Sequence, residues 1–222
     1  MDEVARPRRR KRRHELPDGG PAATARALAS AANARAVILV EGFSDQIALE
    51  TLAGRRGRDL VAEGVAIVPI GGAQALGRFL VAFASRGVTL AGLCDAGEEA
   101  VFRRNLEAQG LGSRLTRTGM EALGFFVCDR DLEEELIRAL GTDSVEDVLA
   151  ANGDLEAFRT FQKQPSWRGR SREAQLRRFM GSADRRKLRY ARLLVDALDL
   201  DRVPRPLEGV LAAHVPNRRR GR

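Results

Sequence analysis

The chain contains few of the residues on which disulfide-rich and zinc proteins depend. Its 222 residues include two cysteines, Cys94 and Cys128, and two histidines. Two cysteines cannot build a disulfide framework or a four-cysteine zinc site, and the scattered histidines argue against a mixed zinc site. No apolar run approaches the roughly 20 residues of a membrane span, and no apolar stretch follows the charged start as in a secretory signal. We therefore expect a cytoplasmic protein that does not contact membranes.

Lysine is scarce as well, since it supplies three of the 38 basic residues. The formal net charge of +8 is distributed unevenly along the chain. Residues 14–150 hold 13 basic and 20 acidic groups, whereas residues 151–217 hold 14 basic and 8 acidic groups. The rest of the positive charge lies in residues 1–13 and 218–222. An acidic segment between basic flanks indicates a polyanionic partner for the flanks and a separate task for the acidic residues.

Four short apolar runs, each followed by a helical pattern, organise the first two thirds of the chain. The expected strands span residues 36–40, 65–70, 88–94 and 124–128, and the helices that follow them span 44–52, 73–85, 98–109 and 131–140. Uninterrupted apolar runs are typical of strands buried on both faces. Strand and helix in alternation predict an α/β fold with a parallel sheet between two layers of helices. Ser44 is the expected N-cap of the first of these helices.

The strand pattern stops after residue 141. The remaining helices are expected at 143–150, 154–163, 171–180, 183–199 and 206–214. Residues 22–34 are rich in alanine and also predict a helix, whereas the Arg-, Pro- and Gly-containing start has no apolar face. The expected organisation is therefore a disordered basic tail at 1–21, an α/β domain at 22–141, a helical extension at 142–217 and a basic tail at 218–222.

Acidic residues stand where three of the expected strands end. Glu41 follows the first strand, Asp45 lies one helical turn later, and Asp95 follows the third strand, while Asp131 and Glu133 follow the fourth. The carboxyl ends of parallel strands share one edge of the sheet, so these oxygens are expected to converge there. Carboxylates suit Mg²⁺ or Mn²⁺, and two such ions can support phosphodiester cleavage. The alternative is that each acid caps the positive end of a helix.

These acids, in this order, resemble a TOPRIM domain, in the version found in the OLD (overcoming lysogenization defect) nucleases. The resemblance rests on Glu41-Gly42-Phe43-Ser44-Asp45, Asp95 and Asp131-Leu132-Glu133, and it covers about residues 35–140. It continues in the helical part, at Lys187-Leu188-Arg189-Tyr190-Ala191 and Val203-Pro204-Arg205-Pro206-Leu207. It implies a Rossmann-like TOPRIM domain, with a four-stranded, mainly parallel sheet flanked by helices, and a C-terminal helical extension.

The resemblance also implies roles for the acids. Glu41 matches a metal ligand that acts as a general acid or base, and Asp45 and Asp95 match metal ligands. Asp131 and Glu133 match residues that help to bind a second ion. The implied activity is Mg²⁺- or Mn²⁺-dependent cleavage of DNA by a two-ion endonuclease, with RNA as an alternative substrate.

The chain departs from the family in two respects. TOPRIM domains commonly have Asp-x-Asp after the third strand, whereas this chain reads Asp95-Ala96-Gly97 and leaves Glu98 or Glu99 as the substitute. A catalytically degraded nucleic-acid-binding or regulatory module is therefore the alternative function. OLD nucleases also carry an ATPase, but this chain has no G-x-x-x-x-G-K-[ST] phosphate loop. We expect a standalone domain without an ATP site, and any ATPase would be a separate partner.

Two further elements have two interpretations each. Lys187 falls where a basic residue would stabilise the transition state, or it is one charge on the exposed face of an arginine-rich helix. Gly71-Gly72 follows the second strand. It forms either a tight turn or a site where backbone N–H groups hold a phosphate.

Basic residues of the helical part are the candidates for nucleic-acid contacts. The loop around Trp167 and the helices that follow it supply them: Lys163, Arg168, Arg170 and Arg172 in the loop, and Arg177, Arg178, Arg185, Arg186 and Lys187 on the helices. Such side chains bind phosphates irrespective of base sequence. Trp167 would either stack on an unpaired base or pack the helical part against the sheet.

Overall fold

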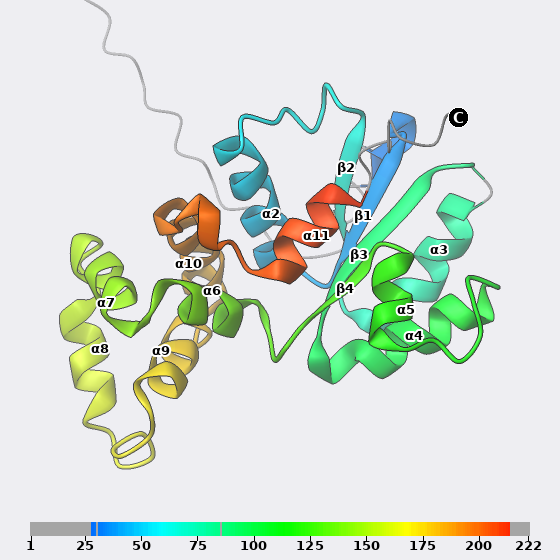
Figure 1. Cartoon of the computed structure of the whole chain (residues 1–222). Helices are drawn as coiled ribbons and strands as arrows, with labels where there is room; N and C mark the ends of the chain where they lie inside the picture. Colours follow the sequence, from blue (N-terminus) through cyan, green and yellow to red (C-terminus); the bar gives the residue numbers. More distant parts are fainter. Residues whose placement is uncertain (1–27, 30, 85, 214–222) are drawn as a thin grey trace, which may run out of the picture.

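The computed structural model describes residues 28–29, 31–84 and 86–213. Its centre is a four-stranded sheet in the order β2-β1-β3-β4 (Figure 1). The strands are β1 (Ala36–Val40), β2 (Val65–Pro69), β3 (Thr89–Asp95) and β4 (Phe125–Cys128). All three pairings are parallel, with Ala36 opposite Val65 and Thr89. The predicted strands and their parallel arrangement are confirmed.

The helices follow the strands and then continue without further strands. In the α/β part they are η1 (Ala31–Asn33), α2 (Phe43–Arg55), η2 (Ala73–Ala75), α3 (Leu76–Ala84), η3 (Ala96–Glu98), α4 (Glu99–Ala108) and α5 (Arg117–Ala122). The later helices are α6 (Leu132–Leu140), α7 (Thr142–Ala151), α8 (Leu155–Gln162), α9 (Arg172–Met180), α10 (Asp184–Ala197), η4 (Leu200–Arg202) and α11 (Arg205–Ala212).

Side chains alternate between two cores because neighbouring residues of a strand point to opposite faces. Ile38 and Ile67 point to a core shared with α2, α6, α10 and α11, and this core continues into α7, α8 and α9. Leu39 and Val68 point to the second core, which α3, α4 and α5 cover. Figure 1 shows the two helical layers on either side of the sheet and the lobe of α7, α8 and α9 beside them.

Arginines near the end of α2 connect this helix to the C-terminal helices. Arg55 Nη1 donates to the carbonyl oxygens of Val195 and Leu198, both at 2.7 Å. Two neighbouring arginines bind carbonyls further along the chain, Arg56 that of Leu200 and Arg58 that of Leu211. Leu198 is the C-cap of α10, where a carbonyl has no partner further along the helix, so the bonds of Arg55 fix where this helix ends against the α/β part.

Three sequence-based expectations need correction or fall outside the described residues. α5 was not predicted, because it has six residues with Gly119 in its middle; Thr116 caps it by accepting the Gly119 N–H. Ser44 is not the N-cap of α2, which is Gly42, and Ser44 is buried in the first turn. The predicted tails and most of the helix at 22–34 lie outside the described residues, and Ala31–Asn33 form a 3₁₀ turn. No helix in the described part is long and apolar enough to cross a membrane.

Replacement of Arg55 by methionine tests the connection between α2 and α10. The substitution keeps the aliphatic stem but removes two hydrogen bonds to buried residues, so we expect a loss of about 1–3 kcal/mol in the free energy of unfolding. Urea denaturation followed by circular dichroism measures this loss. Arg192→Met, on the exposed side of α10, is the control. Equal stability of the two variants would contradict the assignment.

Candidate metal and nucleic-acid site

Glu41 is fixed at the carboxyl edge of the sheet by its backbone and by its side chain. Its carbonyl oxygen accepts the N–H groups of Gly71 and Gly72, each at 3.1 Å. Both glycines have positive φ, +74° and +108°, which residues with a side chain rarely adopt. Of the two interpretations of this pair, the structure supports the tight turn. Both N–H groups already bind the Glu41 carbonyl and are not free to hold a phosphate. The Asp95 N–H donates to Glu41 Oε1 at 2.9 Å, so the ends of β1 and β3 are joined at this point.

Asp45 lies in the first turn of α2, beside Glu41. Its Oδ2 accepts the backbone N–H of Gly42 at 2.9 Å, so the carboxylate closes the N-terminus of the helix. Burial raises the pKa of Asp45 to about 7, against the opposing effect of this hydrogen bond, and the charges of Glu133 and Glu41 add to the rise.

The pKa values of Glu41 and Asp95 are raised in the same way. Burial is the main cause for each and brings each pKa to about 7. For Glu41 the carboxylate of Asp95 adds to the rise, and for Asp95 those of Asp45, Asp131 and Glu133 do so. Desolvation and like charge both disfavour the ionised form. The acids from three strand ends therefore lie near enough at one edge of the sheet to repel one another.

Asp131 and Glu133, at the start of α6, are partnered by cations from the helical part. Asp131 Oδ1 accepts the Glu134 N–H at 2.9 Å, and its other oxygen forms an ion pair with Arg177. Asp131 therefore also caps a helix, which was the alternative considered for the acids. Glu133 Oε1 lies 3.4 Å from Lys187 Nζ. This oxygen is buried and is the one buried side-chain polar atom of the described residues without a hydrogen bond.

Lys187 reaches the acids from α10. Burial lowers its pKa, but the charges of Glu133, Asp45 and Asp95 outweigh this effect and leave it raised. The side chain is thus a counter-cation within the acid cluster, which we define as Glu41, Asp45, Asp95, Asp131 and Glu133.

The two substitutes for the missing aspartate behave differently. After β3 the chain forms the 3₁₀ turn η3 before α4 begins at Glu99. Glu99 is bound by Arg117 at 2.7 Å. The charge of Glu98 instead adds to the raised pKa of Glu41, to which burial and the charge of Asp95 contribute more. Of the two, Glu98 is the one whose charge acts on the acid cluster.

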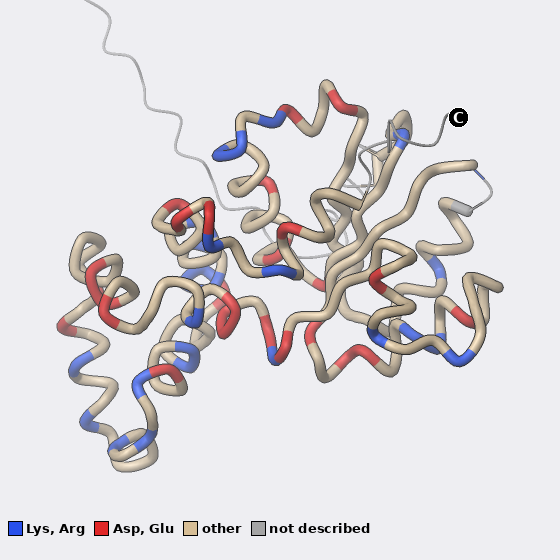
Figure 2. The backbone as a smooth tube through the Cα atoms, in the orientation of Figure 1, with Lys and Arg blue, Asp and Glu red and all other residues tan. Residues whose placement is uncertain are grey.

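The basic loop between α8 and α9 lies in the helical lobe, away from the strand ends (Figure 2). Lys163, Arg168 and Arg170 are exposed, and in the part of the chain that the structure describes they form no ion pair. Trp167 stacks on Phe161, with ring centroids 5.3 Å apart. Trp167 therefore packs within the lobe rather than against the sheet. Of the predicted nucleic-acid contacts, Arg177 and Lys187 lie at the acid cluster, where they pair with Asp131 and Glu133.

The donor set of the cluster fits a hard divalent cation, since it consists of carboxylate oxygens. The buried Oε1 of Glu133 accepts no hydrogen bond and has only its ion pair with Lys187, so it could bind an ion if Lys187 moved away. As the side chains stand, however, no three acids, cysteines or histidines among the described residues are grouped closely enough to surround one ion. An ion would therefore require side-chain rotations, and Lys187 would have to leave Glu133.

Comparison with known proteins identifies the class of this domain. Residues 34–96 match the family model described as "Overcoming lysogenization defect protein-like, TOPRIM domain". This segment is thus similar to an OLD-like TOPRIM domain, which agrees with the resemblance that the motifs indicated. No match was found among curated proteins. TOPRIM domains generally bind divalent metals, and the match supports a nuclease-type or nucleic-acid-related role.

Solved structures extend the likeness of fold beyond the matched segment. The C-terminal region of the OLD protein of Burkholderia pseudomallei is 21% identical, with a TM-score of 0.59 over 80% of this chain and 95% of that one. The C-terminal region of the OLD protein of Xanthomonas campestris pv. campestris is also 21% identical, with a TM-score of 0.60 over 81% and 93% of the two chains. The helical part therefore belongs to the shared fold.

The raised carboxyl pKa values predict how stability depends on pH without divalent ions. Because these groups bind protons more tightly in the folded state, stability falls as pH rises from about 4, the unfolded pKa, to about 7. Asp45→Asn keeps an acceptor for the Gly42 N–H but cannot ionise. We expect it to reduce the fall in melting temperature between pH 5 and pH 7.5 by about 2–4 °C.

Thermal melting in EDTA at the two pH values measures this effect. Asp147→Asn, an exposed acid on α7, removes the same charge elsewhere and should melt like the native chain. An Asp45→Asn profile parallel to that of the native chain would show that the Asp45 pKa is unshifted.

Proposed function

We propose that the acid cluster is the centre of a divalent-metal-dependent endonuclease that cleaves phosphodiester bonds in DNA. The observation that carries the proposal is the position of Glu41, Asp45 and Asp95 at one edge of the sheet, where the Asp95 N–H binds Glu41 Oε1 at 2.9 Å and burial raises the pKa of each carboxyl. Repulsion among buried carboxylates is costly, and bound cations remove it. The OLD-like TOPRIM match supports the same conclusion.

The residues that would hold the ions divide into two groups. Glu41 and Asp95 at the ends of β1 and β3, with Asp45 in the first turn of α2, would hold the first ion after side-chain rotation, with Glu98 in the place of the missing aspartate. Glu133 would bind a second ion through Oε1 once Lys187 moved away, and Asp131 would join it if Arg177 were displaced. Bound Mg²⁺ or Mn²⁺ would lower the pKa of a water molecule and stabilise the leaving oxygen.

The chain's own groups would then position the substrate and move the proton. Glu41 Oε1 is held by the Asp95 N–H, which leaves Oε2 to take up or release a proton. Lys187 would turn from Glu133 toward the scissile phosphate, where its charge would stabilise the transition state. The basic loop with Lys163, Arg168 and Arg170 would hold the backbone further along the strand.

Cleavage of supercoiled plasmid in Mn²⁺ tests the proposed activity. Glu41→Gln and Asp95→Asn keep the hydrogen-bonding shapes but weaken metal binding and proton transfer, so the nicking rate should fall by about 10²–10⁴. Asp147→Asn should cleave at the native rate. Equal cleavage by all four proteins would assign the activity to a contaminant and reject the proposal.

A second candidate function is a nucleic-acid-binding or regulatory module with a degraded site. The observation that favours it is Asp95-Ala96-Gly97, which lacks the second aspartate. This candidate predicts salt-sensitive DNA binding without cleavage in either Mg²⁺ or Mn²⁺. RNA remains an alternative substrate for both candidates, and a parallel assay with a matched RNA duplex distinguishes the two nucleic acids.

The basic loop makes its own prediction for binding. Each phosphate contact contributes about 0.9 to the slope of log K against log salt concentration for duplex DNA. Changing Lys163, Arg168 and Arg170 together to glutamine should therefore lower the slope by up to about 2.7. Fluorescence anisotropy with a labelled duplex in EDTA measures it. Arg192→Gln is the control, and an unchanged slope in the triple variant would remove the loop from the interface.

A further inference from the structure

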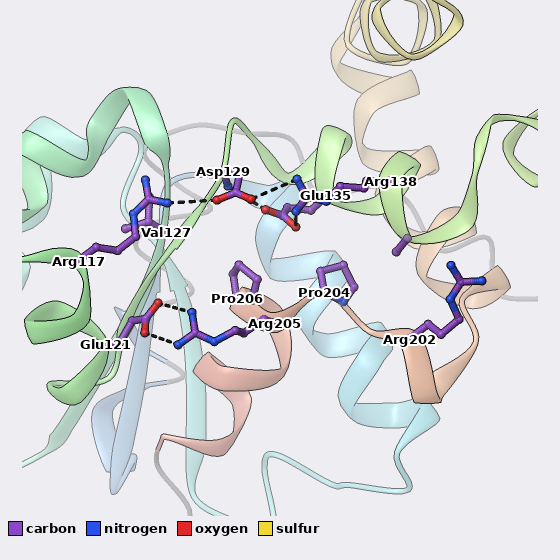
Figure 3. A pocket seen from close by; sticks show the side chains of 11 residues that line it. Arg117, Glu121, Val127, Asp129, Glu135, Arg138, Arg202, Pro204, Arg205 and Pro206 are labelled. Carbon is purple, nitrogen blue, oxygen red and sulfur yellow. Dashed lines mark hydrogen bonds and ion pairs between the residues drawn. The ribbon is translucent and has the colours of Figure 1, made fainter.

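A pocket of about 290 Å³ lies beside the loop between β4 and α6 (Figure 3). Four arginine side chains line it: Arg117, Arg138, Arg202 and Arg205. Pro204 and Pro206 stand between them, and their rings give the pocket a rigid wall. Arg117 comes from α5 and Arg138 from α6, whereas Arg202 ends η4 and Arg205 begins α11. Elements far apart in the sequence thus bring guanidinium groups to one cavity.

Asp129 is held in this pocket as an anionic ligand would be. Its Oδ1 lies 3.1 Å from Arg117 Nη1, and its Oδ2 lies 3.2 Å from Arg138 Nη1. The Asp129 backbone N–H donates to Glu135 Oε1 at 2.8 Å, so a side chain of α6 fixes the backbone at this residue. The side chain is nevertheless 61% exposed. One guanidinium for each carboxylate oxygen is also the arrangement that binds the oxygens of a phosphate.

Three of the four arginines have an acidic partner besides Asp129, and for Arg117 this partner is Glu99 at 2.7 Å. Glu121 neutralises Arg205 through a two-point ion pair, and Glu135 is buried against Arg138. Arg202 is exposed and has no acidic partner among the described residues. If Asp129 turned out to solvent, Arg202 and the Nη1 groups of Arg117 and Arg138 would face an incoming anion, while Glu99 and Glu135 would stay bound to the latter two arginines. Exposed ion pairs contribute little to folding, so this rotation would cost the protein little.

We propose that this pocket binds a phosphate group, and that Asp129 occupies the place of the phosphate until one arrives. Asp131, two residues further along the same loop, belongs to the acid cluster, so the pocket and the cluster share one edge of the sheet. A phosphate of the nucleic-acid backbone is one source, and this version rests on the proposed function. A free phosphate-bearing molecule is the other source and does not require cleavage.

Removal of the built-in anion tests the proposal. Asp129→Asn should bind inorganic phosphate about tenfold more tightly than the native chain, because a competing charged ligand is lost. Arg202→Gln should weaken this binding, and with a labelled duplex it should lower the salt slope by about 1. Calorimetry with phosphate and anisotropy with the duplex, both in EDTA, measure these effects without any contribution from metal or cleavage.

Matched controls lie on α10, where Arg192 pairs with Asp196 on an exposed face. Asp196→Asn and Arg192→Gln make the same charge changes away from the pocket and should leave phosphate binding unchanged. Tighter binding of phosphate and duplex by Asp129→Asn supports a nucleic-acid contact, and tighter binding of phosphate alone supports a free ligand. No gain for either probe, or an equal gain in Asp196→Asn, would overturn the proposal, whatever the outcome of the cleavage assay.

Discussion

The repulsion among five carboxylates at the edge of one parallel sheet is the constraint on which the rest of the structure depends. A parallel sheet places its strand ends together, and here three of those ends carry acids. Burial raises the pKa values of Glu41, Asp45 and Asp95 to about 7. The helical part supplies the opposing charges, since Arg177 binds Asp131 and Lys187 lies beside Glu133. The C-terminal helices therefore supply the cations that balance the acid cluster, and they also supply part of the apolar core.

Hydrogen bonds, and not only apolar contacts, attach these helices to the α/β part. Arg55 binds the carbonyls at the end of α10, and α11 returns to cover β3 and β4. Gly209 shows how closely α11 approaches, because a side-chain carbon there would collide with the ring of Phe126. With α10 held in this way, Lys187 reaches the acids from a defined direction. The position of one cation at the site is thus set by packing more than a hundred residues away in sequence.

The sequence predicted the four strands, their parallel order and the acids at their ends because these features follow from local patterns. An apolar run specifies a buried strand, and an acid that follows it lies at the edge of the sheet where that strand ends. The sequence did not predict the partner of each acid. Asp131 caps α6 and pairs with Arg177, Glu99 pairs with Arg117, and Asp129 faces the arginine pocket, although all three are acids beyond a strand. Side-chain direction and pairing depend on tertiary contacts, which a pattern of residue types does not contain.

Titration with Mn²⁺, followed by electron paramagnetic resonance of the free ion at pH 7.5, tests most directly whether the acid cluster is a metal site. The account predicts saturable binding of at least one ion by the native chain and by Asp147→Asn. It predicts loss of this binding in Asp95→Asn, with the fold retained. Binding that survives in Asp95→Asn, or no saturable binding by the native chain, would contradict the account.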